Sequence, residues 1–331
     1  MTKIRSYFAG GIAVLSSMAA VGASAETIQA EGHFPANSDI GLGLELIAVD
    51  TIEGPVGAKV AFELKDALDG LRIGDEQWFE ITRGDLETAD AMFVGTADTS
   101  SSVTELDDKE VVSCAEKDSD DNCIRETTSY FSCRRYEASF FPDIELISAN
   151  GDVIYSIRKE ETASTDYCSD EETRPSVSDM SDDLMSSFAY RIRYMLAPRA
   201  VRSDYRLLEK RKGLEKPDRK LFKQGLKLTK TDEDAACDVF KGLEATNPQQ
   251  SSVLFNVGLC HERAGDIALA DELYRRASDA DPGKWMIDEA LERIGKKLEA
   301  EAQFAQRAEI LQARYAQLET QDAAAETAEA Q

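Results

Sequence analysis

Six cysteines are the residues of this chain whose chemistry depends most on their partners. Cysteines form either disulfides, which need an oxidising compartment, or metal sites, which need clustered Cys-x-x-Cys motifs or nearby histidines. The chain has 2 histidines, His33 and His261, and no such cluster. We therefore expect disulfides, no metal site and no cofactor. The cysteines are Cys114, Cys123, Cys133, Cys168, Cys237 and Cys260.

A predicted hairpin brings two of these cysteines together. Asn150-Gly151 favours a two-residue type I′ turn, because both turn positions need positive φ. Strands over 130–148 and 153–168 would flank this turn, and counting outward places Cys133 opposite Cys168. The same register pairs Leu146 with Tyr155 and Ile144 with Ile157. Cys114 and Cys123 would then close a short acidic loop, although spacing leaves other connectivities open.

The first 25 residues have the three parts of a secretory signal peptide. Lys3 and Arg5 supply the positive start, an uncharged run spans 9–21, and Ala23-Ser24-Ala25 supplies a cleavage site. The alternative is a membrane anchor, which this short run rich in Gly, Ser and Ala disfavours. We therefore expect cleavage after Ala25, a periplasmic or secreted mature protein, and no transmembrane segment in it.

Charge is distributed unevenly along a chain whose net charge is −25. Residues 26–190 hold 38 acidic and 12 basic side chains, whereas residues 191–230 hold 4 and 14. So acidic a protein is not expected to bind nucleic acid. The basic stretch could contact an anionic envelope surface, or it could neutralise the acidic domain beside it, which we favour.

The change of charge, together with Pro198, Gly213 and Pro217, predicts a boundary between a mixed domain and a helical one. Strand and helix patterns in the first and helical repeats in the second make the expected fold class α+β. The expected segments are a signal peptide over 1–25, an acidic α/β domain with two disulfides over 26–198, a basic linker over 199–217, a helical domain over 218–318 and a disordered tail over 319–331.

The apolar pattern of the N-terminal domain predicts a strand, a helix, further strands, the hairpin and a closing helix over 179–196. Leu42–Val49 has the pattern of a buried strand, and a helix follows Pro55. Two short strands are expected over 78–81 and 91–96. This order resembles the periplasmic α/β domain of the curli-secretion-channel and TolB N-terminal type. The resemblance implies an accessory factor in outer-membrane assembly or secretion.

Residues 251–284 have the length and residue pattern of one tetratricopeptide repeat, which is 34 residues. The matching positions are Leu254, Val257, Gly258, Ala270, Tyr274, Ala277 and Pro282. An upstream unit, one residue shorter in its turn, has Gly225, Ala236, Phe240 and Pro248 at corresponding positions. The chain thus resembles a short tetratricopeptide array, and a long helix over 286–318 would cap it.

This resemblance implies a partner-binding groove lined by the first helix of each unit. Asn256 occupies the position that carboxylate-binding members use to contact a peptide backbone, but Phe222 replaces their companion basic residue. We therefore expect an extended or helical apolar segment as the ligand, with core packing as the alternative role of these residues. The groove residues would be Phe222, Leu226, Phe255, Asn256, Leu259, Glu262 and Arg263.

The same architecture places Cys237 and Cys260 on adjacent helices, where a disulfide would stabilise a short array; two buried thiols are the alternative. The sequence contains no nucleophile elbow, zinc helix, P-loop or dinucleotide loop, so we expect no catalytic or cofactor-binding residues. We expect an exported scaffold or adaptor for protein–protein interactions in the cell envelope. An assembly accessory is the second hypothesis and an enzyme the third. The C-terminal helix is a candidate contact for a homo-oligomer.

Overall fold

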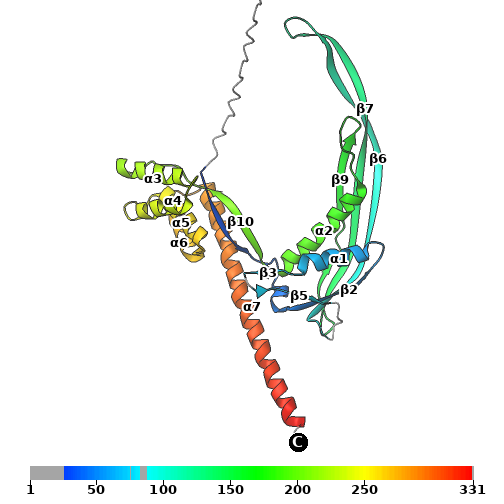
Figure 1. The fold of residues 1–331 in the computed structure, drawn as a ribbon, viewed down its shortest axis with the longest axis vertical. Helices are drawn as coiled ribbons and strands as arrows, with labels where there is room; N and C mark the ends of the chain where they lie inside the picture. Colours follow the sequence, from blue (N-terminus) through cyan, green and yellow to red (C-terminus); the bar gives the residue numbers. More distant parts are fainter. Residues whose placement is uncertain (1–25, 75, 83–87, 330–331) are drawn as a thin grey trace, which may run out of the picture. The chain divides into compact units, whose positions relative to one another are not determined.

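The computed structural model describes residues 26–74, 76–82 and 88–329 (Figure 1). The predicted signal peptide, residues 1–25, lies outside them. The described chain divides into two units, each of which is described by itself. An α/β unit contains residues 31–202 and 289–329, and a helical unit contains residues 26–30 and 203–288. The α+β class is thereby confirmed, although the helical unit does not begin and end where the sequence suggested.

The α/β unit is built on a six-stranded sheet in the order β5-β2-β6-β7-β8, with β9 also paired to β7. Strand β2 pairs in parallel with β5 and β6, and β6 pairs antiparallel with β7. Helices α1 and α2 pack on one face of the sheet and on each other (Figure 1). The strands are β2 (Leu46–Glu53), β5 (Glu80–Thr82), β6 (Ala91–Lys117), β7 (Cys123–Ser148), β8 (Val153–Ile157) and β9 (Glu161–Cys168). The helices are α1 (Gly57–Leu68) and α2 (Val177–Leu196).

The core between these helices and the sheet forms because alternate strand residues meet one apolar stripe of each helix. Phe140 on β7 meets Phe188 on α2 edge to face, with ring centroids 5.3 Å apart. Leu64 on α1 and Phe93 on β6 are fully buried in the same cluster. Short elements complete the unit: the 3-10 helix η1 (Asp39–Gly43), β3 (Arg72–Ile73) and β4 (Glu76–Gln77).

The hairpin register is confirmed at three points, whereas the predicted turn type is wrong. Ile144 pairs with Ile157, Leu146 with Tyr155, and Cys133 with Cys168. Among the non-glycine residues described, only Asp121 has a positive φ, so Gly151 (φ 84°) takes that conformation without Asn150. A type I′ turn needs both. The turn is closed instead by a hydrogen bond from the Ser148 N–H to the Asp152 carbonyl. A register shift between Leu146 and Ile147 then restores the expected strand pairing.

Strands β6 and β7 continue far beyond the sheet, where the sequence predicted strands only over 91–96 and 130–148. Strand β9 accompanies β7 as far as the pair Cys133 and Cys168. Residues 107–132, which we name the arm, then form a two-stranded ribbon in which no residue is buried. An isolated two-stranded hairpin is marginally stable in water. Two disulfides crosslink this ribbon, which has no neighbouring strand beside it: Cys133–Cys168 at its base and Cys114–Cys123 near its tip.

The last helix, α7 (Trp285–Glu329), differs from the predicted cap and tail. From Glu289 onward it belongs to the α/β unit, and it continues through most of the predicted disordered segment 319–331. Polar side chains attach it, including Gln303, which bonds both backbone groups of Ala36 at 2.7 and 3.1 Å. Phe304 of α7 also packs edge to face on Trp78, with ring centroids 5.7 Å apart. The apolar periodicity of the helix did not reveal this partner, because many of the contacts that attach it are polar. No helix in the described ranges is both long and apolar enough to cross a membrane.

The helical unit contains two successive helix pairs, and the same kind of glycine–aromatic contact occurs in each pair. A Cβ on Gly225 would lie 2.9 Å from the ring of Phe240, and a Cβ on Gly258 would lie 2.9 Å from the ring of Tyr274. Each glycine thus lets an aromatic side chain of the following helix approach its backbone. This repetition supports the repeat pattern, and the tetratricopeptide assignment stays a prediction. The helices are α3 (Lys216–Leu228), α4 (Glu233–Glu244), α5 (Ser251–Ala264) and α6 (Ile267–Ala280).

The predicted linker 199–217 is ordered by backbone and side-chain hydrogen bonds. Its first part is strand β10 (Arg199–Arg206), which pairs with β1 (Thr27–Phe34) in a two-stranded sheet. The next part, residues 207–214, lies against α5 in the helical unit. The basic composition of this stretch favoured a linker, but its leucines are buried.

Candidate protein-binding site

The seven predicted groove residues lie in the helical unit, and most of them are inside it. Phe222, Leu226, Phe255, Asn256, Leu259 and Glu262 are buried. The Glu262 carboxylate accepts a hydrogen bond of 2.6 Å from the Tyr274 hydroxyl. Arg263 is partly exposed and pairs with Glu233 and Asp234 of α4. In this structure these side chains pack within the unit, which was the alternative role for them.

Asn256, which the repeat pattern predicted to contact a peptide backbone, contacts the chain's own backbone. The Leu208 N–H donates to Asn256 Oδ1 at 2.9 Å, and Asn256 Nδ2 donates to the Leu208 carbonyl at 3.1 Å. All four groups are buried. A carboxamide has one donor end and one acceptor end, so a single side chain satisfies both backbone groups of one residue.

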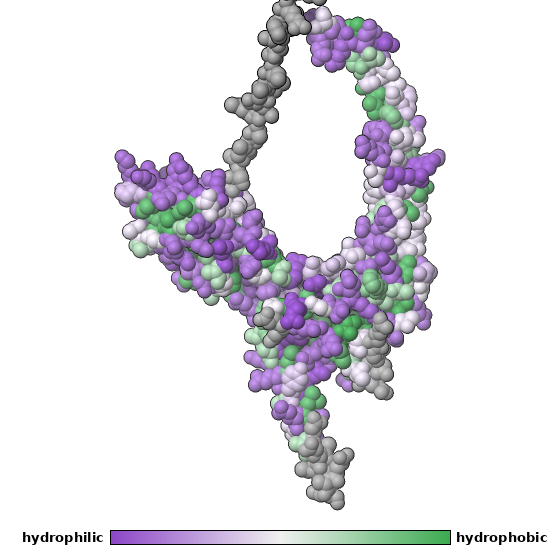
Figure 2. All heavy atoms as spheres, viewed as in Figure 1, coloured by the Kyte–Doolittle hydropathy of each residue, from purple (hydrophilic) through white to green (hydrophobic). Residues whose placement is uncertain are grey.

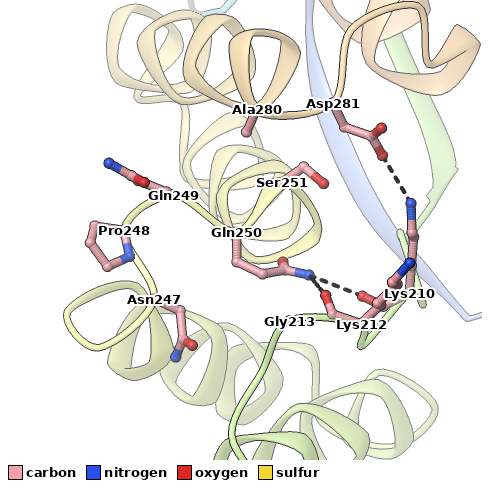
Figure 3. Close-up of a pocket in the computed structure, with 10 residues that line it drawn as sticks. All are labelled: Lys210, Lys212, Gly213, Asn247, Pro248, Gln249, Gln250, Ser251, Ala280 and Asp281. Atoms are coloured by element: carbon pink, nitrogen blue, oxygen red, sulfur yellow. Dashed lines mark hydrogen bonds and ion pairs between the residues drawn. The ribbon is translucent and has the colours of Figure 1, made fainter.

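A second carboxamide of α5 holds the same segment further along. Gln250 Nε2 donates to the carbonyls of Lys210 and Lys212, each at 3.3 Å, as Figure 3 shows. Lys210 Nζ lies 3.5 Å from an Asp281 carboxylate oxygen. We name residues 207–214 the bound segment. Three of its residues, Leu207, Leu208 and Leu214, are buried.

An open cavity of about 580 Å³ lies beside the bound segment (Figure 3). The bound segment forms one wall, and the α4–α5 connection and the start of α5 form the other. Asn247 at this wall is held by Asp218, whose carboxylate accepts from its Nδ2 at 2.8 Å. The lining combines polar and apolar surface, and its polar residues include Lys212, Asn247, Gln249, Gln250, Ser251 and Asp281. Its volume is within the range of ligand-binding clefts in proteins.

The third predicted disulfide, Cys237–Cys260, joins α4 to α5 beside this site, with 5.5 Å between the Cα atoms. All three predicted pairs are therefore confirmed. The bond connects the two helix pairs, which otherwise rely on packing between neighbours. It fixes the position of α5, the helix that carries Asn256 and has Gln250 as its N-cap.

One group of side chains in the described ranges has the composition of a metal site. Cys168, Asp170 and Glu171 bring three potential ligand atoms together. The Cys168 sulfur is in a disulfide and therefore offers no thiolate. Asp170 pairs with Lys109 at 2.7 Å, and this hydrogen bond lowers the pKa of the Asp170 carboxyl. We assign no ion to this group.

Sequence reasoning found Asn256 but missed its ligand, the bound segment. The available signal was Leu207-Leu208, an apolar pair inside a stretch of otherwise basic composition. Gln250 was also missed, because a carboxamide just before a helix is equally typical of a solvated surface. Gln250 additionally caps α5, since its Oε1 accepts from the Val253 N–H at 2.8 Å.

Comparisons with known proteins add little to this site. No family model matches the chain, and no curated protein matches it. Among solved structures, the chain is similar to a PelC dodecamer from Paraburkholderia phytofirmans that carries a point substitution. That match is 15% identical, covers 50% of this chain and 98% of that chain, and has a TM-score of 0.21. At this TM-score the likeness assigns neither fold nor function to this chain.

Proposed function

We propose that this protein is an exported, non-enzymatic adaptor that holds another protein of the cell envelope through its helical unit. The observation that carries the proposal is that two carboxamides, Asn256 on α5 and Gln250 at its N-cap, hold the bound segment by its backbone. These carboxamides contact main-chain groups and are occupied by the chain's own residues, so a partner's segment is proposed to bind beside them.

The partner's segment is proposed to enter the cavity beside the bound segment. The buried Phe and Leu side chains of the predicted groove are already packed within the chain, which removes them as an apolar docking surface. The cavity remains open, and the polar side chains Gln249, Ser251 and Lys212 are in its lining. The ligand that fits it is therefore a short extended stretch held by backbone and polar contacts.

Three disulfides support an oxidising compartment for this adaptor, since such bonds rarely persist in the cytosol. Cleavage after Ala25 and a periplasmic or secreted location complete the proposal. The N-terminus of the purified protein tests this part separately. A mature chain that begins at Glu26 is expected, and a cytoplasmic protein that keeps residues 1–25 would refute export while leaving the adaptor role testable.

Photocrosslinking in cells tests the binding site. A photoreactive amino acid at Gln249 or Lys212, on the wall of the cavity, should capture a discrete partner protein. Matched control positions are Glu272 and Arg275 of α6, whose side chains are 64% and 68% exposed. The partner band should be absent from these controls. Indistinguishable adducts at all four positions, or none at the cavity, would refute the proposed site.

A further inference from the structure

Helix α3 carries a stripe of lysines without carboxylate partners. Lys216, Lys220, Lys223 and Lys227 recur at spacings of four and three residues, which places them on one side of the helix over about 16 Å. All four are exposed, and none forms an ion pair within the part of the chain that the structure describes. Figure 2 shows a hydrophilic surface over this helix. An unpaired basic stripe on a chain of net charge −25 indicates an anionic partner.

The arm has the opposite property, an excess of carboxylates. Residues 107–132 contain 8 acidic and 3 basic side chains. Each of the three basic groups already has a carboxylate partner: Lys109 pairs with Asp170, Lys117 with Asp121, and Arg125 with Glu116. Within the described ranges, this leaves several arm carboxylates without an ion pair. They are Asp107, Asp108, Glu110, Asp118, Asp120 and Glu126.

One face of the arm combines these carboxylates with exposed apolar side chains. Glu110 pairs with Tyr130 and Val112 with Thr128, and alternation along the strand puts Glu126 on the same face. Tyr130 is 65% exposed and Val112 55% exposed. Glu110 and Glu126 are therefore about 13 Å apart along the ribbon, since Tyr130 and Glu126 are separated by four residues of strand. This spacing fits within the length of the α3 stripe.

We propose that the arm of one copy of this chain binds the α3 lysine stripe of a second copy. The contact joins the two unpaired surfaces of opposite sign, and the partner is supplied by the protein itself. The aliphatic stems of the lysines can cover Val112, and an ammonium group can lie on the Tyr130 ring. The two surfaces differ, so the contact is head-to-tail and extends to a closed ring or an open chain of copies. It uses neither the cavity nor the bound segment, and thus goes beyond the adaptor role.

Charge-reversal variants of the mature, disulfide-bonded protein test this contact. The stripe variant is Lys220→Glu/Lys223→Glu/Lys227→Glu, and the arm variant is Glu110→Lys/Glu126→Lys. A control, Lys241→Glu/Arg275→Glu/Lys296→Glu, makes the same charge change as the stripe variant at exposed positions elsewhere. Circular dichroism and a thiol count confirm that each variant is folded and oxidised.

Sedimentation velocity should show wild-type protein associating at an ionic strength of about 0.1 M and dissociating near 1 M. Each reversed variant alone should be monomeric, while the control still associates. An equimolar mixture of the stripe and arm variants should associate again, because the intact arm of one variant meets the intact stripe of the other and the two reversed surfaces are also of opposite sign.

A wild-type protein that stays monomeric at every concentration would overturn the proposal. An arm that contacted α3 of its own copy would also give this monomeric result, so it would count against the proposal. A mixture that stays monomeric, or a control that dissociates like the stripe variant, would overturn it as well. These readouts need no adaptor partner, so failure of the adaptor proposal leaves them unchanged.

Discussion

The Asn256 carboxamide bonds both backbone polar groups of Leu208, at 2.9 and 3.1 Å, inside the helical unit. A position that the repeat pattern associates with ligand binding is therefore occupied in cis. The relationship explains why a stretch with 14 basic residues over 191–230 is ordered in its middle, since buried backbone groups at Leu208 find partners on α5.

Replacing Asn256 with Ala should lower the free energy of unfolding by about 2–4 kcal/mol, because two buried backbone groups of Leu208 lose their partners. Urea titration of the oxidised protein measures this. Gln249→Ala, on the wall of the cavity, is the matched control and should change stability by less than about 0.5 kcal/mol. Equal stabilities for the two variants would contradict the assigned role of Asn256.

Removing the Cys237–Cys260 bond should destabilise the helical unit by about 3 kcal/mol, as expected for a loop of 23 residues. The variant Cys237→Ala/Cys260→Ala should lose helical signal at a lower urea concentration than wild type. Cys114→Ala/Cys123→Ala is the comparison, and it should leave that transition unchanged.

The tip disulfide should instead protect the arm from proteolysis. Limited proteolysis of Cys114→Ala/Cys123→Ala is expected to cut within residues 107–132 faster than in wild type, because a two-stranded ribbon without lateral support opens easily. Mass spectrometry locates the cut. Unchanged cleavage rates in this region would show that strand pairing alone stabilises the arm.

Arg307 should be the main attachment of α7 within the α/β unit. Its guanidinium is buried, lies 4.2 Å from the centre of the Trp78 ring, and donates to four backbone carbonyls. These belong to Gly41, Leu42, Leu44 and Trp78. Arg307→Met should cost about 3 kcal/mol, whereas Arg275→Ala, at an exposed pair, should cost less than about 0.5 kcal/mol. Thermal unfolding compares them, and a similar effect of both would argue against a structural role for Arg307.

The attachment of α7 should weaken in acid, because protonation of Asp90 removes the charge that pairs with Arg314 of this helix. Burial raises the pKa of this carboxyl, but hydrogen bonds from Arg314 and from the Leu46 and Glu45 amides outweigh it and hold the pKa below 3.8. A lowered folded-state pKa gives stability that is present above the unfolded-state value and lost as the pH falls through the folded one. The stability difference between wild type and Asp90→Asn should therefore exist near neutral pH and shrink below pH 3.8. A stability difference between wild type and Asp90→Asn that stays constant from neutral to acidic pH would contradict this role of Asp90.

The hairpin register and its Cys133–Cys168 pair could be predicted from the turn dipeptide and the strand pattern, whereas Cys237–Cys260 followed from the resemblance to a tetratricopeptide array. Asn150-Gly151 marked the position of the turn correctly, although the predicted turn type was wrong. The register further along the strands does not depend on the turn type, because it is set by which strand faces pack in the core. The repeated glycines at 225 and 258 were visible for a similar reason: each makes one fixed close approach to an aromatic side chain. In contrast, the arm was underestimated, since polar residues on both faces give no alternating pattern.

By itself, the sequence predicted the three disulfides, while leaving other pairings open, together with the α+β class and the two helix pairs, since each has a signal in residue type and spacing along the chain. Only the tertiary structure decided that residues 207–214 lie on α5 and that α7 from Glu289 belongs to the α/β unit. Both arrangements depend on single polar side chains, Asn256 and Arg307 among them, that meet backbone groups distant in sequence. Such a bond requires one correctly placed donor or acceptor, and it leaves no periodic trace along the chain.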